Sequence, residues 1–263
     1  MTTAAKIRWG LLVAVLACGA ALAVWPKLDA PAQPKHWRVE VKASYPHDPE
    51  AFTQGLAFHE GRLYEGTGQY GRSSIRRIAL PSGEIEAMQP LSALYFGEGI
   101  TIFDGKLHQL TWVNQVGFVY DLETFERVAT FRYEGEGWGL THDGKHLIMS
   151  NGSERIVFLD PSTYEVVRTI RVRSEGRPVV RLNELEYVDG EIWANIWYED
   201  RIARIDPRDG EVVGWIDASR VYPRSERGRE DVLNGIAYDP KSRRLIITGK
   251  NWPRLYEVEV VPL

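Results

Sequence analysis

The sequence has almost no cysteine and no large excess of charge of either sign. Its one cysteine, Cys18, permits neither an internal disulfide nor a cysteine-rich zinc or iron–sulfur site. There are 32 lysines and arginines against 36 aspartates and glutamates, and a formal net charge of −4 offers no field for a phosphate backbone, so we expect no nucleic-acid partner. Strong helix-forming stretches are few. The 263 residues are instead rich in glycine (24) and tryptophan (9), which predicts an all-β fold of short strands and tight turns.

The first 25 residues have the layout of a secretory signal. Lys6 and Arg8 precede the main apolar run, and residues 21–23 (Ala-Leu-Ala) have the small-x-small form of a cleavage site. We therefore expect an exported protein, periplasmic or secreted. Two alternatives stay open: lipid attachment at Cys18, and an uncleaved membrane anchor, although the apolar run is short for a bilayer span of about 20 residues. An uncleaved or lipidated leader is the only membrane contact that we expect.

The residues after the leader differ in composition from the rest of the chain. Residues 26–37 contain three prolines and predict an extended linker. We therefore divide the chain into a signal peptide or membrane anchor (residues 1–25), a linker (26–37) and one folded domain (38–263).

The folded domain contains a repeat of about 45 residues, which we find five times. Each copy begins with a polar or aromatic residue and then shows strand-like segments separated by turns such as Asp104-Gly105 and Asp189-Gly190. The five copies begin at Gln54, Glu98, Trp138, Asn183 and Asn234. A four-stranded unit of this length is typical of a β-propeller blade, so the repeats predict a five-bladed β-propeller.

The last repeat is one strand short. It ends at residues 255–261 (LYEVEVV), whereas residues 37–45 (WRVEVKASY) belong to no repeat. We predict that this N-terminal segment supplies the missing outer strand and closes the ring, which removes the free sheet edges that promote aggregation. An insertion at residues 219–231 lengthens the last repeat interval and predicts an exposed loop or short helix.

The residues that begin the repeats are predicted to meet at the mouth of the central channel. Five different side chains in equivalent places suit a small asymmetric ligand. A second ring is expected from the second strand of each repeat, with the members Glu65, Trp112, Asn114, Asn151, Asn195, Trp197, Lys250 and Trp252. His47 and Asp48 lie in a proline-flanked turn and predict a structural role. His142 and His146 are separated by an Asp-Gly turn, so we expect no metal site there.

Several long motifs, in order along the chain, resemble the plant and bacterial glutamine cyclotransferases. The motifs are residues 45–56 (YPHDPEAFTQGL), 63–68 (LYEGTG), 97–101 (GEGIT), 182–186 (LNELE) and 233–237 (LNGIA). The likeness extends from about residue 38 to the C terminus. It implies a five-bladed propeller enzyme, an acyltransferase that converts N-terminal glutamine of peptides or proteins to pyroglutamate with release of ammonia, without a metal or cofactor.

The resemblance also implies a set of site residues. Carried over position by position, they are Phe52, Gln54, Glu98, Trp112, Trp138, Asn183, Trp197 and Lys250. In the implied reaction the substrate's α-amine must lose a proton and its amide nitrogen must gain one. We assign this transfer to Glu98 as general acid and base. Lys250, Asn183 and Gln54 are the candidates for stabilising the tetrahedral intermediate.

Gln54 and the aromatic members of this set are assigned to substrate binding. Phe52 and the three tryptophans would wall the pocket and exclude water, and the indoles would offer N–H donors. Two other functions stay open. In a calcium-dependent propeller lactonase or esterase, Glu98, Asn183 and Asn234 would be oxygen ligands. A non-catalytic propeller would use the same mouth to bind a partner. We expect a monomer, because a closed ring leaves no sheet edge to pair.

Overall fold

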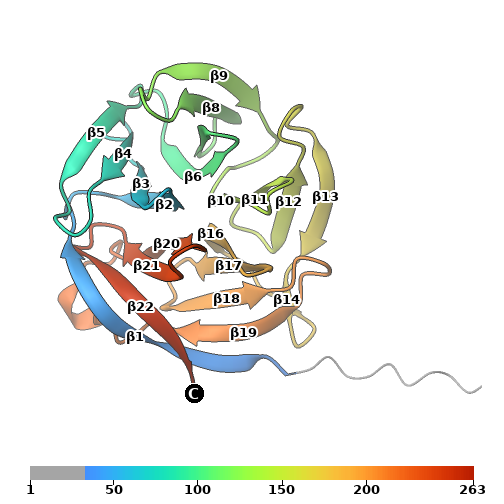
Figure 1. The fold of residues 1–263 in the computed structure, drawn as a ribbon. Coiled ribbons are helices and arrows are strands. Elements are labelled where there is room, and N and C mark those ends of the chain that lie inside the picture. Colours follow the sequence, from blue (N-terminus) through green and yellow to red (C-terminus); the bar gives the residue numbers. More distant parts are fainter. Residues whose placement is uncertain (1–32) are drawn as a thin grey trace, which may run out of the picture. The chain divides into compact units, whose positions relative to one another are not determined.

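The computed structural model describes residues 33–263, and in these residues β-strands make up nearly all of the regular structure (Figure 1). The predicted leader at residues 1–25, with Cys18, lies outside the described residues, as does most of the linker. The described part holds no helix that is both long and apolar enough to cross a membrane. The all-β prediction is therefore confirmed for this part of the chain.

The strands form consecutive antiparallel units around a ring, one for each repeat. The first two blades contain β2 (Thr53–His59), β3 (Arg62–Thr67), β4 (Ser74–Ile78) and β5 (Ile85–Pro90), then β6 (Gly97–Phe103), β7 (Lys106–Thr111), β8 (Val116–Asp121) and β9 (Arg127–Arg132). The third contains β10 (Leu140–His142), β11 (Leu147–Ser150), β12 (Arg155–Leu159) and β13 (Val166–Arg171). A small hairpin of β14 (Arg173–Ser174) and β15 (Arg177–Pro178) follows.

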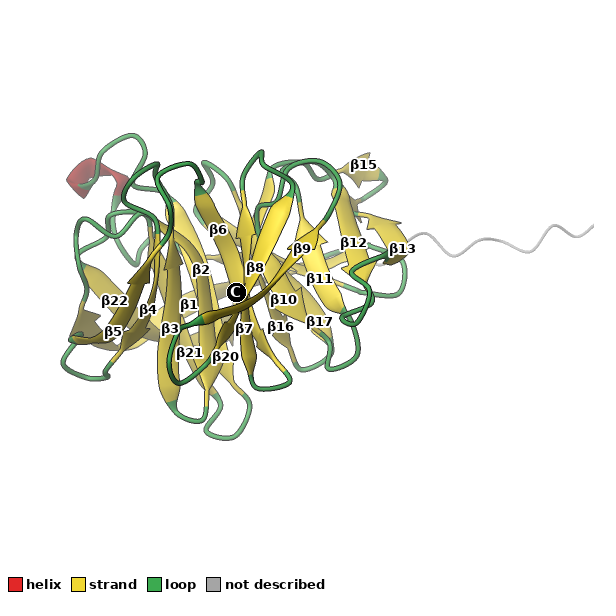
Figure 2. Cartoon of the chain, turned by 90° about the horizontal axis from the view of Figure 1, so that it is seen from above, coloured by secondary structure: helices red, strands yellow, loops and turns green. Residues whose placement is uncertain are grey.

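The last two blades are joined in one eight-stranded sheet. They contain β16 (Leu182–Val188), β17 (Glu191–Ile196), β18 (Arg201–Ile205) and β19 (Val212–Asp217), then β20 (Leu233–Asp239), β21 (Arg244–Gly249), β22 (Arg254–Pro262) and β1 (Lys35–Pro46). The predicted loop at 219–231 contains the exposed 3-10 helix η1 (Arg224–Glu226), which Figure 2 shows among the loops at one edge of the ring.

Strand β1 closes the ring as predicted. It pairs antiparallel with β22, from Trp37 opposite Pro262 to Pro46 opposite Arg254, and its first residues pair parallel with β19. Figure 1 shows β1 and β22 together at the outer edge. The strand begins at Lys35, where the backbone already pairs with β19, so its first residues come from the segment predicted as linker.

Burial decreases from the innermost to the outermost strand of a blade. The first five residues of β2 are buried, whereas β9 buries one residue of six. An inner strand packs against both neighbouring blades, so its two faces are apolar, as in Leu56 and Ala57, whereas an outer strand faces solvent on one side. Between the fifth and first blades, Leu56 packs in one core cluster with Ile246 and Leu255, so the main apolar contacts lie between blades.

Adjacent inner strands approach to backbone contact at the start of the repeats. A Cβ atom on Gly55 would lie 2.4 Å from the backbone nitrogen of Ile100, and one on Gly139 would lie 2.1 Å from the carbonyl oxygen of Asn183. These distances leave no room for a side chain, which explains why glycine follows the first residue of these repeats. The close approach brings the first residues of neighbouring repeats next to one another.

The fourth repeat has Glu184 where the other repeats have glycine. Its buried carboxylate accepts backbone N–H groups from Leu56 in the first blade (3.2 Å) and Ile236 in the fifth (2.9 Å). Burial raises the pKa of Glu184 well above its usual range. One side chain therefore ties three inner strands together around the axis.

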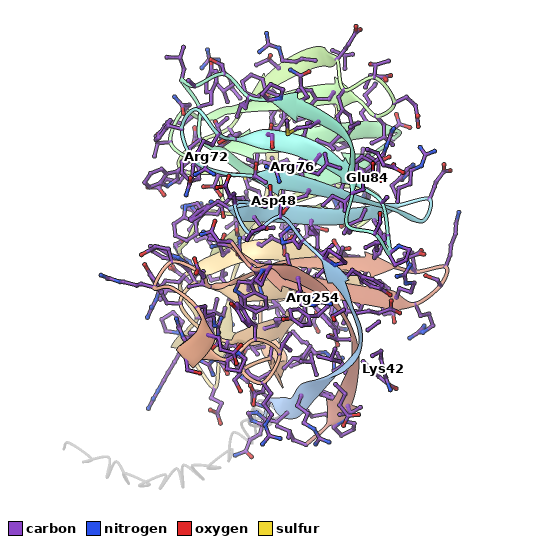
Figure 3. All side chains as sticks on the ribbon, turned by 90° about the vertical axis from the view of Figure 1, so that its left-hand side faces the viewer. Lys42, Asp48, Arg72, Arg76, Glu84 and Arg254 are labelled. Atoms are coloured by element: carbon purple, nitrogen blue, oxygen red, sulfur yellow. The ribbon has the colours of Figure 1, made fainter. Side chains whose placement is uncertain are left out.

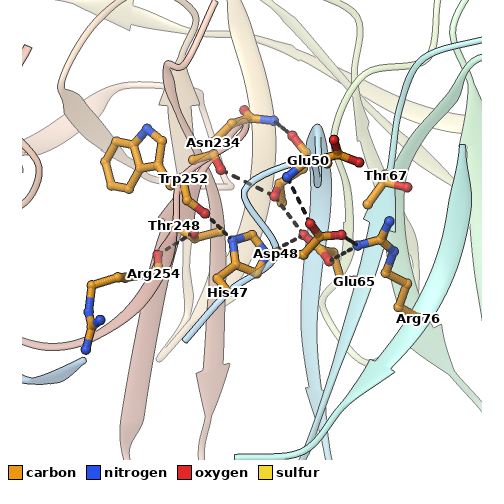
Figure 4. A network of polar contacts seen from close by, with 12 residues as sticks. His47, Asp48, Glu50, Glu65, Thr67, Arg76, Asn234, Thr248, Trp252 and Arg254 are labelled. Carbon is orange, nitrogen blue, oxygen red and sulfur yellow. Dashed lines mark hydrogen bonds and ion pairs between the residues drawn. The ribbon is translucent and has the colours of Figure 1, made fainter. Parts of the chain in front are cut away.

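A buried polar network joins the first and last blades beside the closing strand (Figure 4). Nδ1 of His47 lies 2.7 Å from the carbonyl oxygen of Trp252, and Nε2 lies 2.9 Å from Oε1 of Glu65. Arg76 bonds Asp48 at 2.8 Å and lies 3.8 Å from the other oxygen of Glu65. Figure 3 shows Asp48 and Arg76 near each other at the side of the first blade. His47 and Asp48 thus have a structural role, as the sequence predicted.

Candidate active site

All eight residues assigned from the sequence line one cavity of about 210 Å³. It is lined by Phe52, Gln54, Phe96, Glu98, Trp112, Trp138, Asn183, Trp197, Glu230 and Lys250. Pockets for drug-sized ligands are usually about 300–1,000 Å³, so this cavity suits a smaller group such as one amino-acid side chain. The repeats therefore converge on a site for a small ligand.

The polar side chains that begin four of the repeats lie at β-bulges. Each inner strand shifts register against its second strand at this point, between Thr53 and Gly55, Gly97 and Ile100, Leu182 and Leu185, and Leu233 and Ile236. A bulge redirects a side chain that the regular pleat would point between blades. This local irregularity places Gln54, Glu98 and Asn183 in the lining of the cavity.

Asn234 lies at the fourth bulge but outside the cavity lining. Its amide nitrogen donates to Oε1 of Gln54 at 3.1 Å and to the carbonyl oxygen of Thr53 at 2.9 Å. The prediction that Asn234 lines the channel mouth with Gln54 is therefore wrong, because the Asn234 side chain bonds Gln54 and the backbone of Thr53 and does not line the cavity. The lactonase alternative placed Glu98, Asn183 and Asn234 around one calcium ion, but Asn234 does not line the cavity that Glu98 and Asn183 share.

The three members of the second ring that line the cavity, Trp112, Trp197 and Lys250, lie just beyond the end of their second strands. The backbone N–H groups of Trp112, Trp197 and Lys250 each donate to a carbonyl two residues before the start of their repeat, at 2.9–3.0 Å. The first blade has Gly68 in this place, donating to Phe52 at 2.8 Å. A Cβ on Gly68 would lie 2.4 Å from the ring of Phe96, so the missing side chain makes room for that ring.

The other members predicted for the second ring lie outside the cavity lining. They are Glu65, Asn114, Asn151, Asn195 and Trp252. Glu65 and Asn195 lie within regular strands, whose pleat directs both side chains into buried contacts, to His47 and to the backbone of Gly235. The indole of Trp252 donates to the carbonyl of Asp231 at 2.9 Å. Spacing along the sequence did not distinguish a position inside a strand from one beyond its end.

Two lining residues were absent from the sequence-based assignment. Phe96 stands two residues before Glu98, just as Phe52 stands two residues before Gln54, and this repeated spacing would have identified it. Glu230 comes from the insertion at 219–231 and accepts a hydrogen bond from the Tyr198 hydroxyl at 2.7 Å. No sequence signal indicates Glu230, because its place depends on how the inserted loop folds back on the ring.

Glu98 is buried at the cavity, with 4% of its surface exposed. Burial raises the pKa of Glu98 well above its ordinary value of 4.5. The Lys250 ammonium and a hydrogen bond from Gln54 act in the opposite direction, and the charge of Glu136 adds to the rise. A carboxyl group with a raised pKa can both accept and return a proton near neutral pH.

Lys250 has the opposite perturbation. Burial lowers its pKa to about 8, although the carboxylates of Glu98 and Glu230 favour its charged form. Its Nζ lies 4.6 Å from the ring centroid of Phe52, within the range of a cation–π contact. The cavity therefore holds one acid and one base whose pKa values are shifted toward each other, an arrangement that is common at catalytic sites.

The aromatic walls form two groups of edge-to-face contacts. Phe96 lies between Phe52 and Trp112, with ring centroids 6.1 Å and 5.7 Å away. Trp138 and Trp197 pack with centroids 5.4 Å apart at 87°. Such contacts hold the rings rigidly and leave little room for water beside a bound ligand.

Two buried polar atoms in the lining lack a partner among the described residues: Oδ1 of Asn183 and Nε1 of Trp197. The indoles of Trp112 and Trp138 are already engaged, since both donate to Oε2 of Glu136. The expectation that all three indoles offer free donors is therefore wrong for these two. Asn183 can accept an N–H group and Trp197 can donate to an acceptor, and a primary amide has both kinds of group.

Residues 33–263 contain no group of three or more histidine, cysteine, aspartate or glutamate side chains placed to hold a metal ion. His146 instead lies 3.1 Å from Asp143 in the same turn. His142 is the last residue of β10, and His146 lies in the turn between β10 and β11.

Comparisons with known proteins agree with this geometry. A family described as glutamine cyclotransferase matches residues 11–260. The chain is 45% identical over 227 residues to a glutaminyl-peptide cyclotransferase of Arabidopsis thaliana, covering 84% of this chain and 71% of that one. Its structure is similar to a crystal structure of glutaminyl cyclase from Myxococcus xanthus, with a TM-score of 0.83 and 38% identity, over 88% of this chain and 100% of that one.

Proposed function

The chain belongs to the glutamine cyclotransferase family, and we propose that it is a metal-independent glutaminyl-peptide cyclotransferase, an acyltransferase acting on peptides and proteins with N-terminal glutamine. One observation carries the proposal. The free acceptor of Asn183 and the free donor of Trp197 match a primary amide, in the same small cavity as the buried Glu98 and Lys250. The side chain of glutamine ends in such an amide.

Glu98 acts as the proton shuttle in this proposal. The α-amino group, whose reference pKa is about 7.7–8.0, attacks the side-chain amide carbon in its neutral form. As the new C–N bond closes the five-membered ring, the amine proton passes to the carboxylate of Glu98. Glu98 returns this proton to the amide nitrogen when the old C–N bond breaks, and ammonia leaves. The substrate supplies proximity, because both reacting groups belong to one residue.

Lys250 and Trp197 are the donors that we assign to the amide oxygen, where negative charge develops. Gln54 is held by Asn234, whose amide nitrogen donates to its Oε1, and the Gln54 amide favours the ionised form of Glu98. Asn183 accepts an N–H of the substrate through its free Oδ1, so its assignment as an oxyanion donor is replaced by one as an acceptor.

Release of ammonia from a glutamine-initiated dipeptide tests the function. We expect ammonia and the cyclised product from that dipeptide, and neither from its N-acetylated form, which has no free amine. Because no proposed step uses a metal, the rate should be the same in EDTA. Loss of turnover in EDTA and its return with calcium would contradict metal independence, and absence of ammonia would favour the non-catalytic binding propeller.

The pH profile of kcat/KM tests the role of Lys250. We expect kcat/KM to rise as the substrate amine and Glu98 lose their protons, and to fall on the alkaline side as Lys250, with its pKa lowered to about 8, loses its charge. In Lys250→Arg the guanidinium stays charged, so the fall of kcat/KM on the alkaline side should move to higher pH. This shift is expected even if the maximum rate of the variant is lower. The substrate amine titrates identically in both proteins. If the alkaline side of the kcat/KM profile is unchanged in Lys250→Arg, a group other than Lys250 controls it.

Export remains a prediction that rests on residues 1–25, and the monomeric state remains a prediction that rests on ring closure. The mass of the intact protein from its native source distinguishes a cleaved leader from lipid attachment at Cys18 and from an uncleaved anchor. Sedimentation of the same sample gives the assembly state.

A further inference from the structure

Glu136 lies in the loop between β9 and β10 and binds two walls of the cavity through one oxygen. Nε1 of Trp112 donates to its Oε2 at 2.7 Å, and Nε1 of Trp138 donates to the same atom at 2.8 Å. The two tryptophans come from different blades, since Trp112 follows β7 and Trp138 precedes β10. A single exposed carboxylate therefore spans the boundary between the second and third blades at the cavity.

The repeats have different residues at the position of Glu136, with Arg181 in the fourth repeat and Val232 in the fifth. Glu136 stands two residues before Trp138, in the place that Phe52 and Phe96 occupy before the first residues of their own repeats. Both phenylalanines line the cavity with their rings. A position that needed only packing could hold an aromatic ring in this blade too, whereas a carboxylate adds a charge and an acceptor for both indoles.

The backbone of this loop is held independently of the Glu136 side chain. The N–H of Gly137 donates to the carbonyl of Trp112 at 2.9 Å, and the N–H of Trp138 donates to the carbonyl of Ser150 at 3.1 Å. The carbonyl of Trp138 in turn accepts the N–H of Gly99 at 2.7 Å. Substitutions at position 136 should therefore leave the path of the chain intact and change only what the side chain does.

We propose that Glu136 is a positioning residue for the cyclisation: it fixes the Trp112 and Trp138 indoles and keeps their N–H groups away from the substrate amide. This inference rests on the proposed function. With both indoles engaged, Trp197 remains as the indole donor for the substrate within the described residues. The amide is then oriented in one way, with its oxygen toward Trp197 and its nitrogen toward Asn183, instead of being shared among three similar donors.

The charge of Glu136 has a second effect, on Glu98. The groups that act on the Glu98 carboxyl are the Lys250 ammonium, the Gln54 amide and the Glu136 carboxylate, and Glu98 in turn affects the Tyr133 hydroxyl. Of these, Glu136 opposes ionisation of Glu98. Removing its charge should lower the pKa of Glu98 and move the acidic limb of the rate profile to lower pH.

Glu136→Gln and Glu136→Ala separate the two effects. The glutamine keeps an oxygen that can accept both indole N–H groups but has no charge, whereas the alanine lacks both. We expect both variants to shift the acidic limb of kcat/KM to lower pH. Only Glu136→Ala should also raise KM, by about tenfold or more, because misplacing a binding group by about 1 Å can cost up to about 100-fold. Glu134→Ala, in the same loop and also exposed, is the matched control and should behave as the wild type.

An NMR measurement on the full chain with labelled indole nitrogens tests the hydrogen bonds without turnover. The Trp112 and Trp138 resonances, assigned through Trp→Phe variants, should shift in Glu136→Ala and stay near their wild-type positions in Glu136→Gln. If Glu136→Ala leaves both resonances, KM and the pH profile unchanged, Glu136 is an ordinary surface carboxylate and the inference is wrong. If the wild type releases no ammonia, the proposed function is wrong, and so is the positioning role of Glu136 in the reaction. The indole shifts still report whether Trp112 and Trp138 are hydrogen-bonded to Glu136.

Discussion

Glu98→Gln is expected to lower kcat for ammonia release by about 10²–10⁴-fold, the usual contribution of a positioned general acid–base group. The glutamine side chain has nearly the same size and can still bond Gln54, so the shape of the cavity is retained. It cannot take a proton from the amine or deliver one to the leaving nitrogen. The loss should therefore appear in kcat, with KM changing little, because the substrate amide is bound chiefly by Asn183 and Trp197.

Steady-state ammonia release and thermal unfolding, measured on the same sample, separate a chemical defect from a folding defect. An unchanged Tm with the expected fall in kcat supports the assignment. Added formate should restore part of the rate to Glu98→Ala, since a small carboxylate can enter the space that the side chain leaves. If Glu98→Gln turns over at the wild-type rate, Glu98 is not the general acid and base, and another group in the cavity must accept the proton.

Glu65→Leu is expected to reduce the free energy of unfolding by about 3–5 kcal/mol, the usual cost of removing one partner of a buried ion pair. Glu65 is fully buried, and its Oε1 accepts a hydrogen bond from Thr53 at 2.7 Å as well as contacting His47. Without the carboxylate, His47 and Arg76 lose their buried counter-charge at the junction of the first and last blades. At about 2–4 °C per kcal/mol for a domain of this size, Tm should fall by roughly 6–20 °C.

The pH dependence of this loss identifies the pair. Burial lowers the pKa of His47, but the Glu65 carboxylate more than offsets this and raises it above 6.5, so its stabilisation is complete below pH 6.5 and is lost as pH rises through the folded value. Burial raises the pKa of Glu65, but His47 and Arg76 bring it below 4.5, so its stabilisation is present above pH 4.5 and is lost on acidification. The difference between wild type and Glu65→Leu should therefore be largest between these two pH values.

Denaturant unfolding from pH 4 to 8 measures this difference. Glu123→Gln is a suitable control, because Glu123 belongs to exposed ion pairs with Arg62 and Arg77 and should leave the curve unchanged. A constant difference at every pH would show that Glu65 acts by packing alone. A loss no larger than that of Glu123→Gln would show that the network does not stabilise the ring closure.

Much of the fold could be predicted because its signals are local. Strands alternate with turns within each repeat, and the repeats recur at intervals of 40 to 51 residues, so residues 54 to 261 predict a propeller without any knowledge of contacts. The closing role of β1 followed from a strand count, since the last repeat lacked its fourth strand. Eight lining residues were predicted through the resemblance to the glutamine cyclotransferases, whose motifs this sequence carries in order.

The direction of individual side chains could not be predicted in the same way. Glu65 and Trp112 both belong to the second strand of a repeat by spacing, yet one is buried against His47 and the other lines the cavity. The difference depends on whether a residue lies within the pleat or past its end, and on where a bulge interrupts the register. Asn234 was misplaced for this reason, since its bulge turns it toward Gln54 and the backbone behind it.

The sequence by itself determined the repeat, the ring and the residue types available for chemistry, because each depends on short-range pattern and composition. Only the tertiary structure decided which donors are free. Glu136 engages two of the three indoles, and Glu230 reaches the cavity from an inserted loop. Both facts depend on contacts between segments of different blades. Such contacts form only when distant parts of the chain pack together, so local sequence patterns do not predict them.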